Sequence, residues 1–309
     1  MYRVNEGLMR KAPIFILAAP RSFSTITAAI LGGHPQAYSV PELNLLIKDY
    51  MKEFMVQNRD VYFMQMHGIL RTVSELYAGE QTMDTISMAH RWVRKRIDRR
   101  TSEIYEEICR KIYPLTLVDK SPAYTITPDR LHRIKKSFPD AYILHLTRHP
   151  VAMNKSMCKL EKGKLMAALA DSVDYSSSEE IVDPQLLWHT CNSMTLEFME
   201  TIDERRKLTI KGEDIINNRV EALKKVCSWL EWEWSEDIYE MMMHPEDSVY
   251  ANFGPIGAEL GGDPNFLRSP EIRDGQLSKN NLEEELEWLK KGRRLYPHVK
   301  ELAQQLGYE

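Results

Sequence analysis

The sequence contains no long apolar run and few cysteines. None of its apolar stretches approaches the roughly 20 residues that a helix needs to cross a bilayer, and residues 1–11 lack the apolar core of a signal peptide. Both absences argue against a membrane protein. Cys109, Cys158, Cys191 and Cys227 are widely spaced and show neither a CxxC motif nor zinc-type Cys/His spacing. We therefore expect reduced core thiols in a cytoplasmic protein.

An excess of positive charge is also absent. The 309 residues include 41 Lys and Arg against 45 Asp and Glu, which gives a formal net charge of −4 at pH 7. A protein that binds nucleic acid along its surface usually carries a clear basic excess. The composition therefore argues against a nucleic-acid partner, and it leaves room for a local basic site.

A third absence is the Walker A pattern GxxxxGK[ST], although the chain opens with a strand, a polar loop and a helix. Residues 13–19 form a short apolar run without alternation, as expected of a strand buried on both faces. Residues 20–25 are mostly polar, and residues 26–31 resume as a helix that two glycines end. The loop is the first candidate for a ligand site.

Further strands alternate with helices along the chain. Strands are predicted at residues 115–118, 141–146 and 207–210, and a long terminal helix at 282–306, interrupted near Gly292 and Pro297. Residues 250–269 are rich in Gly, Pro and Asn and read as a loop. The pattern predicts a single α/β domain over residues 1–309, with a P-loop-like parallel sheet flanked by helices and a helical insertion at about 43–110.

The loop after the first predicted strand suits an anion. The first N–H groups of a helix have no intrahelical partners, and the helix dipole adds positive potential. Arg21 adds a permanent charge, and Ser22, Ser24 and Thr25 add hydroxyl donors. The alternative is that Ser22 or Ser24 only caps the helix.

Two segments resemble motifs of sulfotransferases that use 3′-phosphoadenosine 5′-phosphosulfate (PAPS). Residues 19–25, APRSFST, resemble the 5′-phosphosulfate loop, usually PRSGST or PKSGTT, with Phe23 where the family has glycine. Residues 148–156 resemble the 3′-phosphate motif, an Arg after a strand and a Ser eight residues later. The resemblance implies that PAPS is the cofactor. It implies the following binding residues: Arg21, Ser22, Phe23, Ser24, Thr25, Arg148 and Ser156. Alone, Arg148 reads equally well as one half of a surface ion pair.

The same resemblance implies three catalytic residues. Glu42 stands where several sulfotransferases have their general base, and a carboxylate beside a basic loop can accept a proton. Lys120, in the segment DKSP, resembles the lysine that contacts the sulfuryl group, and Arg21 shares this task. Glu42 could also be a helix-start residue, and Lys120 a solvated loop lysine. No metal is implied.

Residues 41–46 and 262–267 are similar to sulfotransferase domains of cyanobacterial polyketide synthases. This similarity implies a small natural product as acceptor, through a hydroxyl or an amine. The acceptor could be a polyketide chain, free or bound to a carrier protein, or an alkaloid toxin. Two other classes stay open, a P-loop-type kinase and a non-catalytic nucleotide-binding protein. The missing Walker lysine argues against the first, and Glu42 with Lys120 argues against the second.

Overall fold

A five-stranded parallel sheet lies at the centre of the computed structural model, which describes residues 9–58, 63–160, 163–175, 181–272, 277, 280–286 and 293–309. The strand order is β2-β3-β1-β4-β7, and every neighbouring pair is parallel. The strands are β1 Ile14–Leu17, β2 Ala37–Val40, β3 Thr116–Asp119, β4 Tyr142–Thr147 and β7 Lys207–Lys211. A two-stranded hairpin stands apart, formed by β5 Val173–Asp174 and β6 Ile181–Val182.

The central strand β1 explains why the sheet is covered on both sides. All four of its residues are fully buried, and they alternate between two cores. Phe15 and Leu17 pack into one core with α2 to α6, while Ile14 and Ile16 pack into the other with α1, α10, α11 and α12. An apolar residue is therefore required at every position, which produces the non-alternating run seen in the sequence.

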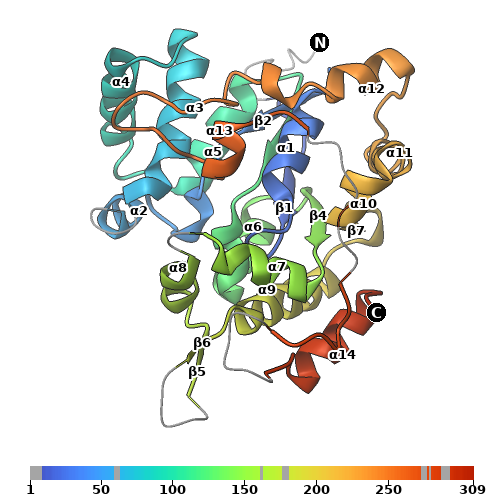
Figure 1. Cartoon of the computed structure of the whole chain (residues 1–309). Coiled ribbons are helices and arrows are strands. Elements are labelled where there is room, and N and C mark those ends of the chain that lie inside the picture. Colours follow the sequence, from blue (N-terminus) through green and yellow to red (C-terminus); the bar gives the residue numbers. More distant parts are fainter. Residues whose placement is uncertain are drawn as a thin grey trace.

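Helices form layers on both faces of the sheet, with α2 to α5 grouped on one side and α10 to α12 on the other (Figure 1). The first half of the chain contributes α1 Ser24–Gly32, α2 Met51–Gln57, α3 His67–Ala78, α4 Met83–Arg94, α5 Thr101–Lys111, α6 Pro128–Ser137 and α7 Pro150–Cys158. The second half contributes α8 Gly163–Leu169, α9 Pro184–Glu200, α10 Gly212–Asn217, α11 Arg219–Trp229, α12 Glu236–Met242, α13 Pro264–Arg268 and α14 Pro297–Gln305. This arrangement confirms the predicted fold class, and helices α2 to α5 form the insertion between β2 and β3.

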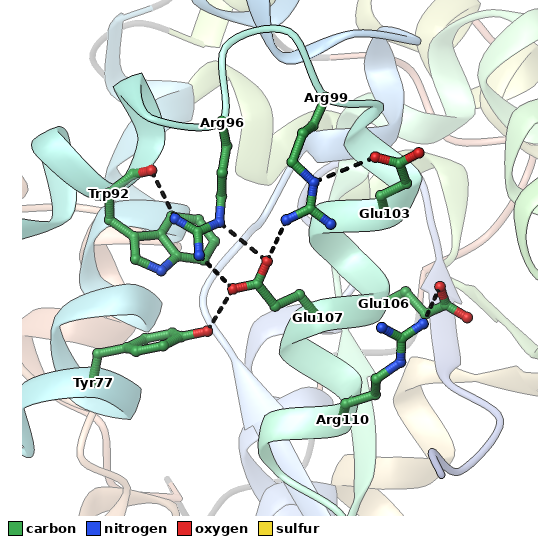
Figure 2. A network of polar contacts seen from close by, with 8 residues as sticks. All are labelled: Tyr77, Trp92, Arg96, Arg99, Glu103, Glu106, Glu107 and Arg110. Atoms are coloured by element: carbon green, nitrogen blue, oxygen red, sulfur yellow. Dashed lines mark hydrogen bonds and ion pairs between the residues drawn. The ribbon is translucent and has the colours of Figure 1, made fainter. Parts of the chain in front are cut away.

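A network around Glu107 ties the inserted helices together (Figure 2). The carboxylate of Glu107, on α5, accepts hydrogen bonds from Tyr77 on α3 and from Arg96 and Arg99 in the α4–α5 connection, at 2.6 to 3.1 Å. Burial tends to raise the pKa of Glu107, but these three donors outweigh it and hold the pKa below its usual value. The guanidinium of Arg96 also stacks over the Trp92 ring at 3.6 Å. The network therefore holds α3, α5 and the α4–α5 connection together.

Three sequence predictions need correction. β2 was not expected, because its pattern is half exposed and only one neighbouring strand covers it. The predicted loop at 250–269 contains a short helix, α13. The terminal helix is shorter than predicted: residues 282–286 are not helical, and α14 starts at Pro297, whose fixed φ suits a first helical position. Residues 287–292 lie outside the described part.

Two kinds of feature are missing from the described ranges. No helix there is long and apolar enough to cross a membrane. No group of three or more His, Cys, Asp or Glu side chains in those ranges is placed to hold a metal ion.

Candidate functional site

The predicted site residues gather at the carboxyl ends of the strands. Arg21 lies in the loop after β1, Glu42 follows β2, Lys120 follows β3 and Arg148 follows β4. Glu213, just after β7, accepts a hydrogen bond from the main-chain N–H of His149 at 2.9 Å and so braces the Arg148 segment. In open parallel sheets the ligand crevice lies at the carboxyl ends of the strands, and the candidate residues of this chain lie at those ends.

The loop after β1 has an unusual backbone. Arg21 and Phe23 adopt φ values of 64° and 61°, in the left-handed region that glycine favours. Phe23 occupies the N-cap position of α1 and makes no side-chain cap hydrogen bond. Its ring instead lies 4.1 Å beneath the guanidinium carbon of Arg148, against Gly212. Strain of this kind is concentrated at functional sites, and here the cation–π contact accompanies it.

Arg21 connects the two candidate phosphate motifs. Its Nε donates to Ser156 Oγ at 3.1 Å, and its main-chain carbonyl accepts from Arg148 at 2.6 Å. Its Nη1 donates to Asp263 at 2.5 Å. Ser156, Arg148 and Arg21 are therefore neighbours, although they come from α7, the end of β4 and the loop after β1.

Two buried polar atoms at this place have no hydrogen-bond partner among the described residues: Ser22 Oγ and Arg148 Nε. Burial lowers the pKa of Arg148 to about 10, and within the described ranges no carboxylate forms an ion pair with it. A buried cation without an ion-pair partner is costly. An anionic ligand would supply the missing partner, so these residues fit a phosphate or a phosphosulfate.

Glu42 and Lys120 face each other directly. Lys120 Nζ forms an ion pair with Glu42 Oε1, and the two side chains are 5% and 26% exposed. The main chain of Glu42 is held as well, because its N–H donates to the Gly261 carbonyl at 2.7 Å and Gly68 of α3 lies against it. A Cβ at Gly68 would collide with the Glu42 carbonyl oxygen. The geometry therefore places a proton acceptor and a cation at one point.

A cavity opens beside this pair. Its polar lining includes Glu42, Lys120, Arg71 and Thr25. The rest is mainly apolar or small, from α1, β2 and the 248–267 segment: Ala28, Ala29, Ser39, Val40, Pro41, Ser248, Tyr250, Gly261, Gly262, Phe266 and Leu267. A largely apolar cavity with a few convergent polar groups is typical of a small-molecule site.

Comparison with known proteins decides the family. Residues 13–236 match the model of the sulfotransferase family, Sulfotransfer_3. The chain belongs to the sulfotransferase family. Among solved structures, this sulfotransferase is similar to the sulfotransferase domain from the curacin biosynthetic pathway, with 26% identity, a TM-score of 0.76 and coverage of 97% of this chain and 99% of that one.

A second similar structure is the sulfotransferase domain of the Synechococcus PCC 7002 olefin synthase. The identity is 25%, the TM-score is 0.75, and the match covers 97% of this sulfotransferase and 96% of that chain. No curated protein matched the sequence. The predicted resemblance to sulfotransferase domains of natural-product pathways is thereby confirmed.

Most of the predicted residues of this sulfotransferase do come together. Glu42 contacts Lys120, and Arg21 contacts Ser156 and Arg148. The other loop residues occupy the loop itself and the first turn of α1: Ser22, Phe23, Ser24 and Thr25. Their individual roles remain predictions.

Two charged residues of the sulfotransferase site were missed. Asp263 reaches Arg21 from the start of α13. Arg71, on α3, is 2% exposed and donates to Gln81 and to the carbonyls of Asn252 and Leu260 at 2.7 to 3.0 Å. The sequence contains no local signal for Arg71, because residues 67–74 of α3 are all buried and no single face of the helix marks this arginine.

His149 directly follows Arg148 in the chain, but its side chain makes its contacts elsewhere. Its Nδ1 caps α7 by accepting from the Val151 N–H at 3.3 Å, and its ring packs edge-on against Tyr308. Burial lowers its pKa below the usual value. The His149 side chain therefore caps α7 and packs beside Tyr308, near the C-terminus of the chain.

Proposed function

We propose that this sulfotransferase moves the sulfuryl group of PAPS to a hydroxyl or amine of a small natural product and releases adenosine 3′,5′-bisphosphate. One observation carries the proposal. A carboxylate and an ammonium, Glu42 and Lys120, meet beside a cavity, and two buried donors nearby, Ser22 Oγ and Arg148 Nε, have no hydrogen-bond partner among the described residues. The similarity to sulfotransferase domains of the curacin pathway and the olefin synthase supports a natural-product acceptor.

The residues divide the work between them. Arg21, Ser22, Ser24, Thr25 and the first N–H groups of α1 bind the 5′ end of the donor. Arg148 and Ser156 bind its 3′-phosphate, with Phe23 stacked beneath Arg148. PAPS supplies a sulfuryl group that is already activated for transfer.

At the reacting end, Glu42 takes the proton of the acceptor hydroxyl or amine. A sulfur–oxygen or sulfur–nitrogen bond to the acceptor forms while the bond to the phosphate oxygen breaks. Lys120, with Arg21, donates hydrogen bonds to the oxygens on which negative charge grows. The cavity, which residues of the 248–267 segment line in part, excludes water and orients the acceptor.

A screen of candidate acceptors with labelled PAPS tests the proposal. The panel contains free polyketide hydroxy acids, the same acids on a carrier protein, and guanidinium alkaloids, and the readout is the product mass. We expect one acceptor class to gain one SO₃ with equal release of the bisphosphate. Glu42→Gln should lose roughly 10²-fold or more in turnover and still bind the bisphosphate, whereas Glu259→Gln, at an exposed carboxylate, should stay active.

Other outcomes would select the other classes. Magnesium-dependent phosphoryl transfer from ATP would identify a kinase. Tight binding of the bisphosphate without transfer to any acceptor would identify a non-catalytic nucleotide-binding protein. Either result would replace the proposed function.

A further inference from the structure

The segment after Glu42 is held by three buried side chains that the proposed function does not use. Asp119, the last residue of β3, is fully buried and pairs in the sheet with Val40 of β2. Ser121 and Tyr124 follow it and are also fully buried. All three therefore lie at the carboxyl end of β3, which carries Lys120 and pairs with the end of β2 that carries Glu42.

The three side chains are joined to one another. Ser121 Oγ donates to Asp119 Oδ1 at 2.7 Å, and the Tyr124 hydroxyl donates to Asp119 Oδ2 at 3.0 Å. Both carboxylate oxygens therefore have a partner. Because each hydroxyl uses its single proton on Asp119, its lone pairs stay free to accept from another group.

The Ser121 hydroxyl accepts a hydrogen bond from the main chain that follows Glu42. The Asn44 N–H donates to Ser121 Oγ at 3.1 Å. This bond ties the segment after Glu42 to the hydroxyl that itself donates to Asp119. Asn44 has a left-handed backbone, with φ 53°, so this tight turn requires outside support for its N–H groups.

Keeping this carboxylate buried costs stability. Burial raises the pKa of Asp119 to about 6, and the hydrogen bonds from Ser121 and Tyr124 oppose that rise only in part. An acid whose pKa is raised in the fold destabilises the fold at neutral pH relative to a neutral isostere. A costly group is retained where it determines a geometry that function needs.

We propose that Asp119, with Ser121 and Tyr124, is a positioning group that holds Glu42 against Lys120. The inference rests on the proposed function for the meaning of that geometry. Asp119 precedes Lys120 directly in the chain, and through Ser121 and the Asn44 N–H it is tied to the segment on which Glu42 sits. One buried carboxylate thus sets the distance between the base and the cation.

The test compares two buried tyrosines that face the same carboxylate. Tyr124→Phe removes the hydroxyl that donates to Asp119 Oδ2. Tyr105→Phe, on α5, makes the same chemical change at a hydroxyl with no hydrogen-bond partner among the described residues. We expect Tyr124→Phe and Ser121→Ala each to lower kcat by roughly tenfold, because small misplacements of reacting groups are costly, while Tyr105→Phe keeps kcat.

Asp119→Asn separates positioning from folding. We expect kcat to fall by roughly 10²-fold, with the Kd of adenosine 3′,5′-bisphosphate unchanged and the melting temperature no lower than that of the wild type. Unchanged kcat would overturn the proposal. A kcat loss matched by a drop in melting temperature or in bisphosphate affinity would also overturn it, since Asp119 would then be a general structural residue.

Amide hydrogen exchange provides a readout that does not depend on turnover. In Asp119→Asn and Ser121→Ala, exchange of the peptide covering residues 41–47 should become faster, while peptides from α9 stay protected. If exchange of this peptide is unchanged in both variants, the inference is overturned, whether or not the enzyme transfers sulfuryl groups. If the wild type transfers sulfuryl to no acceptor while the exchange difference is found, the proposed function fails and the structural tie stands.

Discussion

Asp263 and Arg21 are 242 residues apart in the sequence, yet a carboxylate oxygen of Asp263 lies 2.5 Å from a guanidinium nitrogen of Arg21. The same arginine is the charged residue of the proposed phosphosulfate loop. A carboxylate thus contacts the guanidinium that the anionic end of the donor is proposed to bind. Donor binding and the Asp263 contact therefore compete for one cation.

Asp263→Asn should consequently strengthen binding of adenosine 3′,5′-bisphosphate. The amide removes the competing charge and still offers an oxygen to the Asn265 N–H, which Asp263 Oδ1 caps at 3.0 Å. An ion pair of this kind is worth about 1 kcal/mol or less. We therefore expect the Kd of the bisphosphate, measured by calorimetry, to fall by up to roughly fivefold. Glu259→Gln removes the same charge from the same loop without touching Arg21 and should leave Kd unchanged. Weaker binding in Asp263→Asn would show that the carboxylate orients Arg21 for the ligand.

Arg148→Ala should weaken bisphosphate binding by at least tenfold. The Nε atom of its partly buried guanidinium has no partner in the described residues, and hydrogen bonds to charged groups are worth about 1.5–3 kcal/mol. The matched control is Arg205→Ala. This exposed arginine lies just before β7, at the amino ends of the strands and away from the site. Calorimetry that finds equal affinity for both variants and the wild type would remove Arg148 from the nucleotide site.

Lys120→Ala should lower kcat far more than it lowers nucleotide affinity. Lys120 contacts Glu42 rather than the Arg21 and Arg148 cluster, so its ammonium is placed for the reacting end of the donor. Losing one such charge-stabilising donor typically costs about 10²–10³-fold in kcat. Lys207→Ala, which breaks another lysine–glutamate pair at the amino end of β7, should leave kcat unchanged. The reverse pattern, with a larger effect on Kd than on kcat, would make Lys120 a binding residue only.

The sequence predicts the fold best where burial leaves no choice. β1 needs an apolar residue at each position because both of its faces are covered, and β4 is similar except for the buried polar residues His145 and Thr147. β2 lies at the edge of the sheet and contains Tyr38 and Ser39, which are only partly buried, so no pattern marks it as a strand. The interior strands are therefore readable from the sequence, whereas of the two edge strands only β7 was predicted, at 207–210.

The site divides in the same way. Arg21, Lys120 and Arg148 could be predicted because each closely follows a strand that the sequence reveals, and parallel strands bring their carboxyl ends together. Asp263 and Arg71 could not, since they reach the site from α13 and α3, which no local pattern directs toward it. Asp119 is a third kind of case: it directly follows the strand predicted at 115–118, but its role depends on the contact between Ser121 and the Asn44 N–H, 77 residues earlier.

Phe23 offers a clean measure of the strain in the phosphosulfate loop. Its φ of 61° is one that glycine adopts freely and that costs other residues about 1 kcal/mol or more. Replacing it by glycine alone would mix two effects, because the ring that lies under Arg148 is lost at the same time. Comparing Phe23→Gly with Phe23→Ala removes that ambiguity, since both variants lack the ring and differ only in backbone preference and one methyl group.

We expect Phe23→Gly to be more stable than Phe23→Ala by about 1 kcal/mol in urea unfolding, the reverse of the usual order within helices. Ala28→Gly, in the middle of α1, supplies the control, and there glycine should be the less stable residue by a similar amount. If alanine at position 23 is as stable as glycine, the left-handed backbone is not retained once the ring is gone. The stacked Arg148–Phe23 pair, rather than the turn itself, would then hold the loop in its binding shape.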